Sequence, residues 1–301
     1  MSAASAAFDY AQFVLVPQAF NGLVIGVAVI LMALGLTIIF GLLDVFNMAH
    51  GEFYALGAYL GVTLAARGVS FWLLLGLVPL LLLPAGFVVD RALIQRVFHQ
   101  KERHMLTMLL TFGLSIVMED VFKWIYGANT MKPETPLAGG TEILGNFFPT
   151  YRLFLLAIGS ATIAAVWLVV NRTLFGAMVR AAAFDRHMAA SLGVPVRKVY
   201  SATFAFGVAL AGLSGVLLAP IYTVFPTMGK DFILMAFTAV ILGGLGSIRG
   251  VVIGGLLLTQ IQALSSLYVS PVWGDPLVFG IMVLVLFVRP QGMFAGKLRH
   301  V

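Results

Sequence analysis

The chain has 301 residues, of which 61% are hydrophobic and only 10% are charged. Soluble domains carry about 25% charged residues, so this composition excludes an ordinary soluble protein and favours a polytopic membrane protein. The formal net charge of +6 is not a sign of nucleic-acid binding, because the cations stand between apolar runs rather than on one soluble face.

Apolar runs along the chain predict the membrane-spanning segments, since a helix needs about 20 apolar residues to cross a bilayer. In chain order, the runs cover residues 19–42, 47–66, 71–89, 105–126 and 151–170, and then, after a polar stretch, 201–222, 232–245, 251–267 and 276–288. We therefore expect an all-α membrane protein with about eight or nine transmembrane helices in one domain, residues 1–301. The count depends on whether the two glycine-interrupted segments cross the membrane or re-enter it.

Positive charge predicts the orientation, because cytoplasmic loops are enriched in Lys and Arg. Cationic clusters follow the third, fifth and last spans: Arg91, Arg96, Lys101 and Arg103; Arg172, Arg180, Arg186, Arg197 and Lys198; and Arg289, Lys297 and Arg299. All three clusters fall on one side if the N-terminus is outside. We expect an N-terminus outside the membrane and a C-terminus in the cytoplasm.

The first interrupted segment, residues 43–57 (LDVFNMAHGEFYALG), contains Asn47, His50, Gly51 and Glu52. Ionisable groups within a membrane are costly, and they usually mark a pathway or a buried pair. Gly51 permits a break that exposes backbone polar groups. An equally acceptable interpretation is that His50 and Glu52 satisfy their own hydrogen bonds and pin two helices.

The second interrupted segment, residues 242–255 (LGGLGSIRGVVIGG), contains Gly243, Gly244, Gly246 and Ser247. Paired interruptions in the two halves of a chain indicate an internal repeat with a translocation route between the halves. A nucleotide-binding loop is excluded, because no strand precedes these glycines and their spacing is not G-x-G-x-x-G.

Polar side chains also form stripes on two of the predicted spans. On the fourth span they recur every four residues: Thr107, Thr111, Ser115, Glu119 and Lys123. We expect the threonines to bond their own i−4 carbonyls and Glu119 to pair with Lys123 at the outer surface. On the eighth span, we expect Gln262 to be buried, to bond across helices and to belong to the pathway.

The polar stretch between the fifth and sixth spans, residues 172–200, places Phe184, Met188 and Leu192 on one face of a predicted helix. Gly193 and the proline that follows it are typical of a helix end. Two interpretations remain open from the pattern: a solvated or interfacial loop helix, or a short helix that offers compact apolar groups to a cytoplasmic partner.

Three motifs resemble one known family in their order and separation. They are NMAHGE at residues 47–52 followed by GAY at 57–59, AASLG at 189–193, and AVILGGLGSI at 239–248. Together they resemble the LivH-type permease of branched-chain amino acid ABC importers, over nearly the whole chain.

The resemblance implies a BtuC-like helical fold in a bacterial inner membrane. It implies a dimer with a LivM-type permease, two cytoplasmic ABC ATPases and a periplasmic substrate-binding protein. Residues 172–200 become the segment that couples to an ATPase, through a set of matched positions: Arg180, Phe184, Asp185, Met188, Ala189, Leu192 and Gly193. The two interrupted segments become gate or pathway elements.

The resemblance leaves the substrate open, since members of the family also carry urea, short amides and aromatic acids. An ion-coupled secondary carrier remains an alternative, because His50 and Glu52 could relay protons. No catalytic motif or P-loop is found, so we do not expect an enzyme. We expect no cofactor or metal on this chain, and ATP and Mg on the partner ATPases.

Overall fold

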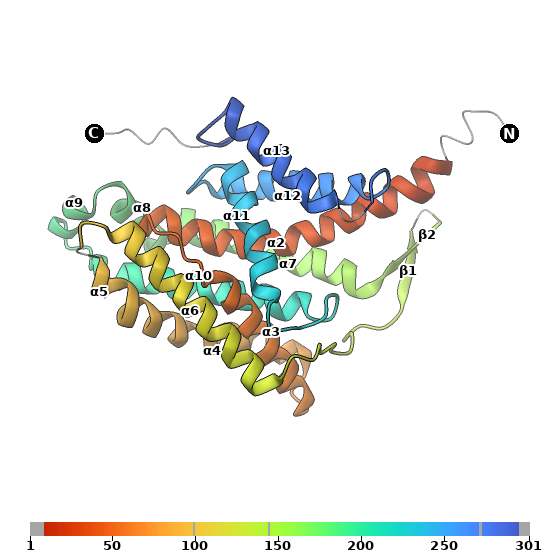
Figure 1. Cartoon of the computed structure of the whole chain (residues 1–301), viewed down its shortest axis with the longest axis horizontal. Helices are drawn as coiled ribbons and strands as arrows, with labels where there is room; N and C mark the ends of the chain where they lie inside the picture. Colours follow the sequence, from red (N-terminus) through yellow and green to blue (C-terminus); the bar gives the residue numbers. More distant parts are fainter. Residues whose placement is uncertain (1–8, 99, 144, 271–272, 295–301) are drawn as a thin grey trace.

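The computed structural model describes residues 9–98, 100–143, 145–270 and 273–294 (Figure 1). Its first half contains η1 (Ala11–Leu15, a π-helical turn), α2 (Val16–Leu43), α3 (His50–Ala66), α4 (Phe71–Val89), η2 (Asp90–Ile94), α5 (Gln95–Val97) and α6 (Arg103–Tyr126). Its second half contains α7 (Thr150–Arg172), α8 (Leu174–Phe184), α9 (Arg186–Ser191), α10 (Val196–Leu218), α11 (Met228–Gly243), α12 (Ile248–Ser265) and α13 (Gly274–Val288). Between the halves, β1 (Gly140–Ile143) and β2 (Asn146–Pro149) form a small antiparallel hairpin, with Gly140 opposite Pro149.

The helical membrane fold predicted from composition is confirmed. Six helical stretches among the described residues are long and apolar enough to cross a membrane, namely Ala11–Leu43, Phe71–Val97, Arg103–Tyr126, Thr150–Arg172, Val196–Leu218 and Ile248–Ser265. The helices α3, α11 and α13 are shorter. The β1–β2 hairpin was not predicted; its strands contain only four residues each, too few to reveal an alternating pattern.

The helix α2 forms the centre of the bundle. It packs against α7, α10, α11 and α12, and Figure 1 shows it running between α10 and α12. Nearly every residue from Gly22 to Leu43 is buried, including consecutive residues on all sides of the helix. A helix that is apolar all round is typical of such a central position.

Small residues allow the helices to approach closely. A Cβ on Gly57 of α3 would collide with the backbone of Gly212 in α10, and a Cβ on Gly26 of α2 would collide with the hydroxyl of Thr259 in α12. At these two positions, close packing of the helices accounts for the glycine.

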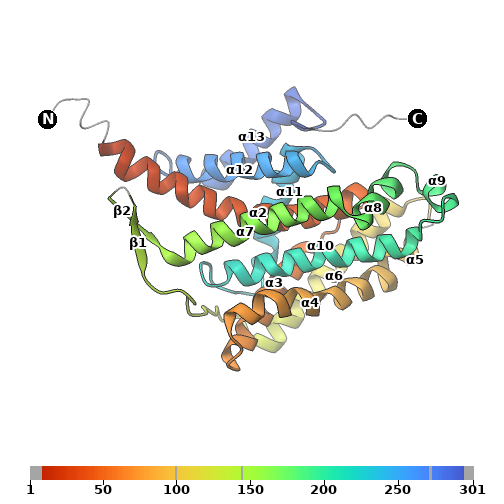
Figure 2. The same cartoon turned by 180° about the vertical axis from the view of Figure 1, so that it is seen from behind.

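The bundle has two distinct ends, visible in both Figure 1 and Figure 2. One end carries α5, α8 and α9, with the cations of residues 91–103 and 172–198; we call it the cation-rich end. The other carries β1 and β2, and we call it the hairpin end. The chain after α13 returns to the cation-rich end, where the amide of Met293 donates to the carbonyl of Leu242 at 2.9 Å. Lys297 and Arg299 lie outside the described residues.

The helices α3 and α11 both begin inside the bundle rather than at one of its ends. The side chain of His50, at the start of α3, reaches the carbonyl of Met32 in the interior of α2, and Gly229 near the start of α11 packs against Gly51. From there α3 runs to the hairpin end, whereas α11 runs to the cation-rich end, where Gly246 packs against Gly41 of α2. The stretches 44–66 and 219–243 therefore each consist of a non-helical half followed by a helix, α3 or α11.

Candidate functional site

The N-terminal ends of α3 and α11 meet in the middle of the bundle. Gly51 and Gly229 lie so close that a Cβ on either residue would collide with the backbone of the other. Glu52 stands in the first turn of α3 and contacts Gly229 through its carboxyl carbon. We call residues 47–52 and 228–230 the helix junction. The positive ends of two helix dipoles converge there, which favours negative charge.

Three polar side chains of the junction are fully buried, and two of them bond to other helices. His50 Nε2 donates to the carbonyl of Met32 at 3.1 Å, and Asn47 Oδ1 accepts from the amide of Ala49 at 3.1 Å. The hydroxyl of Ser115 on α6 donates to Glu52 Oε1 at 3.1 Å. These contacts pin α3 to α2 and α6, as one sequence interpretation required, but through outside partners rather than a His50–Glu52 pair.

The same side chains retain unsatisfied polar atoms. Asn47 Nδ2, His50 Nδ1 and Glu52 Oε2 have no hydrogen-bond partner among the described residues. An unpaired buried polar atom costs about 1–3 kcal/mol, and such atoms inside a membrane protein mark a functional pathway more often than a packing device. The junction therefore remains the strongest pathway candidate.

The stripe on α6 supports the junction. The hydroxyls of Thr107 and Thr111 donate to the i−4 carbonyls at 2.7 and 2.9 Å, as predicted. Thr111 also accepts from the amide of Met48 at 3.1 Å, so it holds the non-helical half of the first interrupted segment.

Glu119, one turn beyond Ser115, joins α6 to α11. Its predicted pair with Lys123 is confirmed, at 2.7 Å, and its second carboxylate oxygen pairs with Lys230 of the junction. The Glu119 side chain is only 8% exposed. Sequence analysis missed Lys230, because no local pattern connects it to α6; its only signal is a charge beside Gly229 at the start of an apolar run.

The second glycine-rich segment lies at the other end of α11 from the helix junction, where Gly246 packs against Gly41 of α2. Its share in a translocation route stays a prediction. Gly243, Gly244, Gly246 and Ser247 form the turn between α11 and α12 at the cation-rich end. Gly244 (φ 102°) and Gly246 (φ 80°) have left-handed backbone conformations that reverse the chain. Ser247 caps α12 by accepting from the amide of Gly250 at 3.1 Å.

Gln262 also lies apart from the junction. It is half-buried on α12, and its side chain packs near Gly274 at the start of α13. Two residues earlier, Gln260 donates to the carbonyl of Ala19 in α2 at 2.9 Å.

Residues 172–200, the predicted coupling segment, contain two helices, α8 and α9, rather than one. This corrects the prediction that Phe184, Met188 and Leu192 share the face of a single helix. Asp185 has an extended backbone (φ −152°, ψ 108°) and separates α8 from α9. Its carboxylate accepts from the amides of Met188 and His187 at 2.9 and 2.8 Å, and these bonds hold the pKa of that carboxyl below its ordinary value. Local capping therefore outweighs helix continuity here. The predicted stop is confirmed, since Gly193 follows α9 with a left-handed φ of 86°.

Within this segment, the apolar side chains of Phe184, Met188 and Leu192 remain exposed, at 87%, 60% and 78%. Ala189 is instead buried against the bundle. The guanidinium group of Arg180 donates to the carbonyl of Val170, which ties α8 to the end of α7. The segment therefore exposes these three apolar side chains, which we call the apolar tip, while other residues of the segment bind it to the bundle.

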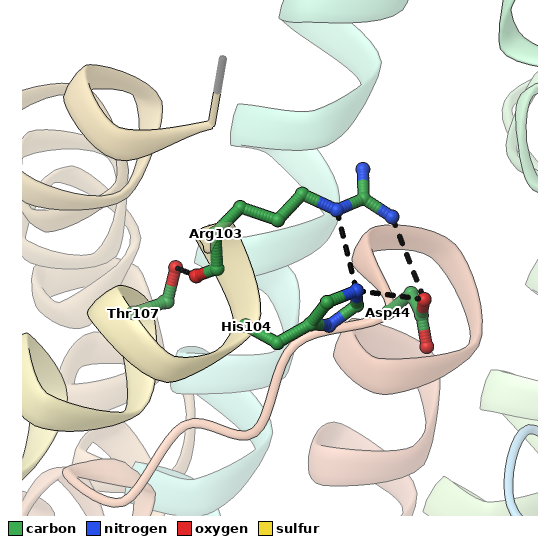
Figure 3. A network of polar contacts seen from close by, with 4 residues as sticks. All are labelled: Asp44, Arg103, His104 and Thr107. Atoms are coloured by element: carbon green, nitrogen blue, oxygen red, sulfur yellow. Dashed lines mark hydrogen bonds and ion pairs between the residues drawn. The ribbon is translucent and has the colours of Figure 1, made fainter. Parts of the chain in front are cut away.

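At the same end, Asp44 links α2 to α6 (Figure 3). It adopts a left-handed conformation (φ 53°) that ends α2, and its carboxylate lies 3.5 Å from the Arg103 guanidinium and 3.6 Å from His104 Nε2. Thr107 donates to the carbonyl of Arg103 in the same network. This network positions the chain where it turns from α2 back toward the helix junction.

Comparison with known proteins agrees with this architecture. Residues 18–286 match the family model described as the branched-chain amino acid transport system / permease component. The chain is 32% identical over 292 residues to the high-affinity branched-chain amino acid transport system permease protein LivH of Escherichia coli (strain K12), with 92% of this chain and 94% of that protein covered.

Two further relatives extend the comparison. BraD, the corresponding permease protein of Pseudomonas aeruginosa, is 30% identical over 293 residues, with 92% and 94% covered. LivM of Escherichia coli (strain K12) is 28% identical over 290 residues, covering 88% of this chain and 67% of LivM. The family match runs from the first turn of α2 to the last turn of α13 and includes the helix junction and the coupling segment. The chain belongs to the family of permease components of branched-chain amino acid transport systems.

Proposed function

We propose that this chain is the membrane subunit of an ATP-driven importer that moves branched-chain or related small amino acids into the cytoplasm. The observation that carries the proposal is the family match over residues 18–286. The relatives LivH and BraD are named as permeases for branched-chain amino acids. On this proposal the chain is not an enzyme, and its partner ATPases bind Mg and hydrolyse ATP.

We assign the gate to the helix junction, with Asn47, His50, Gly51 and Glu52 as its residues. An amino acid is a zwitterion: its carboxylate suits the converging helix N-termini, and its ammonium group suits the unpartnered Glu52 Oε2. The apolar rings of Tyr54 and Phe232, with centroids 4.6 Å apart, lie next to the junction on α3 and α11 and suit an aliphatic side chain. Because Gly51 and Gly229 are in contact, passage requires α3 and α11 to separate.

The other predicted pathway residues receive separate roles. We propose that Gly243, Gly244, Gly246 and Ser247 form the hinge through which α11 moves, since they join it to α12. Gln262 remains a pathway candidate toward the hairpin end of α12.

The coupling segment is the proposed docking site for a cytoplasmic ATPase. Exposed Phe184, Met188 and Leu192 would enter an apolar groove, while Arg180, Asp185, Ala189 and Gly193 hold the two helices in place. This role requires the cation-rich end to be cytoplasmic, with the N-terminus outside a bacterial inner membrane.

The full assembly would contain a LivM-type permease, two ABC ATPases and a periplasmic binding protein. The similarity of this chain to LivM supports a partner subunit of the same family. Substrate selection then rests largely with the binding protein, because a transport path must release what it accepts.

Uptake by the reconstituted complex tests the proposal. Proteoliposomes with Mg-ATP inside and the binding protein outside should accumulate labelled leucine, and unlabelled isoleucine and valine should compete. Uptake should stop without ATP and should continue in the presence of a protonophore. If urea or an aromatic acid competes while the three aliphatic amino acids do not, the substrate assignment is wrong. Uptake that an ion gradient drives without ATP would contradict the importer itself.

A further inference from the structure

A cavity at the cation-rich end is separate from the helix junction and from the apolar tip of the coupling segment. Its volume is about 380 Å³, and it lies between α5, α9 and the start of α10. Phe98, Val196 and Tyr200 form an apolar wall, and Arg186, His187 and Arg197 supply polar and cationic groups. None of the described residues that line it is acidic. The cavity therefore combines an apolar wall with cationic side chains.

Arg186, one of the cavity's two arginines, and Arg103, which lies outside the lining, both contact the ring of Phe98. The guanidinium carbon of Arg186 lies 5.7 Å from the centroid of the Phe98 ring, and that of Arg103 lies 5.3 Å from the same centroid. Phe98 in turn packs on Tyr200, with centroids 5.2 Å apart. Cation–π contacts orient a guanidinium group without neutralising it. Arg186 thus remains available to an anion.

The depth of the cavity indicates the source of that anion. Phe98 directly follows the membrane-spanning stretch Phe71–Val97, and Val196 begins the stretch Val196–Leu218. The cavity therefore lies at the level where a bilayer places its headgroups, whereas an ATPase would contact the exposed tip at Phe184 and Leu192. Basic pockets between helices at this level suit anionic lipids.

We propose that this cavity binds the phosphodiester headgroup of an anionic phospholipid from the leaflet around the cation-rich end. Arg186 and Arg197 pair with the negative charge of its phosphodiester. Phe98, Val196 and Tyr200 contact the glycerol and first methylene groups. Because α9 forms one wall, a bound lipid also fixes α9 against α10. This last consequence for ATPase docking rests on the proposed function; the binding site does not.

The chain offers a matched pair of double variants for the test. Arg186→Gln with Arg197→Gln removes two cations from the cavity, whereas Arg172→Gln with Lys198→Gln removes two exposed cations of the same polar stretch that do not line it. Binding of dioleoyl phosphatidylglycerol to the full-length chain in detergent is measured by native mass spectrometry, with phosphatidylcholine as the neutral reference. The thermal melting temperature of each variant confirms that it is folded.

The cavity variant should bind phosphatidylglycerol on the order of 30-fold more weakly, and the matched variant should stay within about threefold of the parent chain. Equal losses of phosphatidylglycerol affinity in both variants would mean that the lipid is attracted by surface cations in general. That result would overturn the proposal. Displacement of the lipid by millimolar inorganic phosphate would identify a free-phosphate site instead, and so would also overturn it.

Discussion

At the scale of single residues, Glu52 carries a buried carboxyl group that is only half satisfied. Ser115 bonds one oxygen, and the other has no hydrogen-bond partner among the described residues. Nearby, Glu119 binds two lysines and leaves neither oxygen unpaired. The two glutamates therefore have different roles. Glu119 joins α6 to α11, whereas one oxygen of Glu52 has the capacity to bind a ligand.

We predict that Glu52→Gln lowers leucine uptake by about 10- to 100-fold, because a hydrogen bond to a charged group contributes about 1.5–3 kcal/mol. Glutamine keeps the size of the side chain and can still accept from Ser115. Membrane level and assembly with partner subunits should therefore not change. Uptake and co-purification are measured together.

The matched control is Ser115→Ala, which removes the supporting hydrogen bond and leaves the carboxyl group. It should reduce uptake only a few-fold. If Ser115→Ala abolishes uptake while Glu52→Gln retains it, Glu52 serves packing and not the substrate.

At the scale of elements, α3, α11 and the two helices of the coupling segment each begin at a defined place in the fold. α3 and α11 each start inside the bundle, so their free amides face one another across the junction. In the coupling segment, Asp185 ends α8 and caps α9. This cap is complete above pH about 4 and weakens as the pH falls through the lowered pKa of Asp185. The helices that we propose to move and those that we propose to dock are therefore short, and each begins at a defined residue.

We predict that Leu192→Asp uncouples transport from ATP hydrolysis while the chain stays in the membrane. The exposed leucine is proposed to enter an apolar groove of the ATPase, and an unpaired charge there costs several kcal/mol. Co-purified ATPase and leucine uptake should both fall by more than about tenfold. The control, Ser191→Asp, places the same charge on the adjacent exposed residue and should have a much smaller effect. Normal uptake by the Leu192 variant would exclude the docking role.

At the scale of the whole molecule, charge divides the bundle into two unlike ends. The cation-rich end gathers residues 91–103 and 172–198, although these groups are far apart in the chain. The hairpin end carries few cations. Near the helix junction, Lys123 and Lys230 are both paired with Glu119. This asymmetry is the basis for the proposed orientation.

We predict that a cysteine at Glu142, in the hairpin, reacts with a membrane-impermeant maleimide in intact cells, and that a cysteine at Lys101 does not. Both positions are exposed, and the chain has no cysteine of its own, so each label reports one site. In inverted membrane vesicles the pattern should reverse. Labelling of Lys101→Cys alone in intact cells would reverse the orientation and, with it, the docking role of α9.

The membrane class, nearly all helix positions, the cationic clusters and the family were available from sequence. Each depends on local composition: about 20 apolar residues suffice to cross a bilayer wherever they pack, and the NMAHGE, AASLG and AVILGGLGSI motifs are read residue by residue. The Thr107 and Thr111 bonds and the Glu119–Lys123 pair were predictable for the same reason, since both partners lie on one helix turn.

Tertiary structure alone decided the helix junction, the Glu119–Lys230 pair, the place of the Gly243–Ser247 turn and the cavity beside Arg186 and Arg197. These features join residues distant in the chain, and helical periodicity carries no information about which helices become neighbours. The break at Asp185 is local, yet it too was missed, because an aspartate in a helical pattern also suits an exposed helix position. Only the backbone geometry shows that its carboxylate bonds the amides of His187 and Met188 instead.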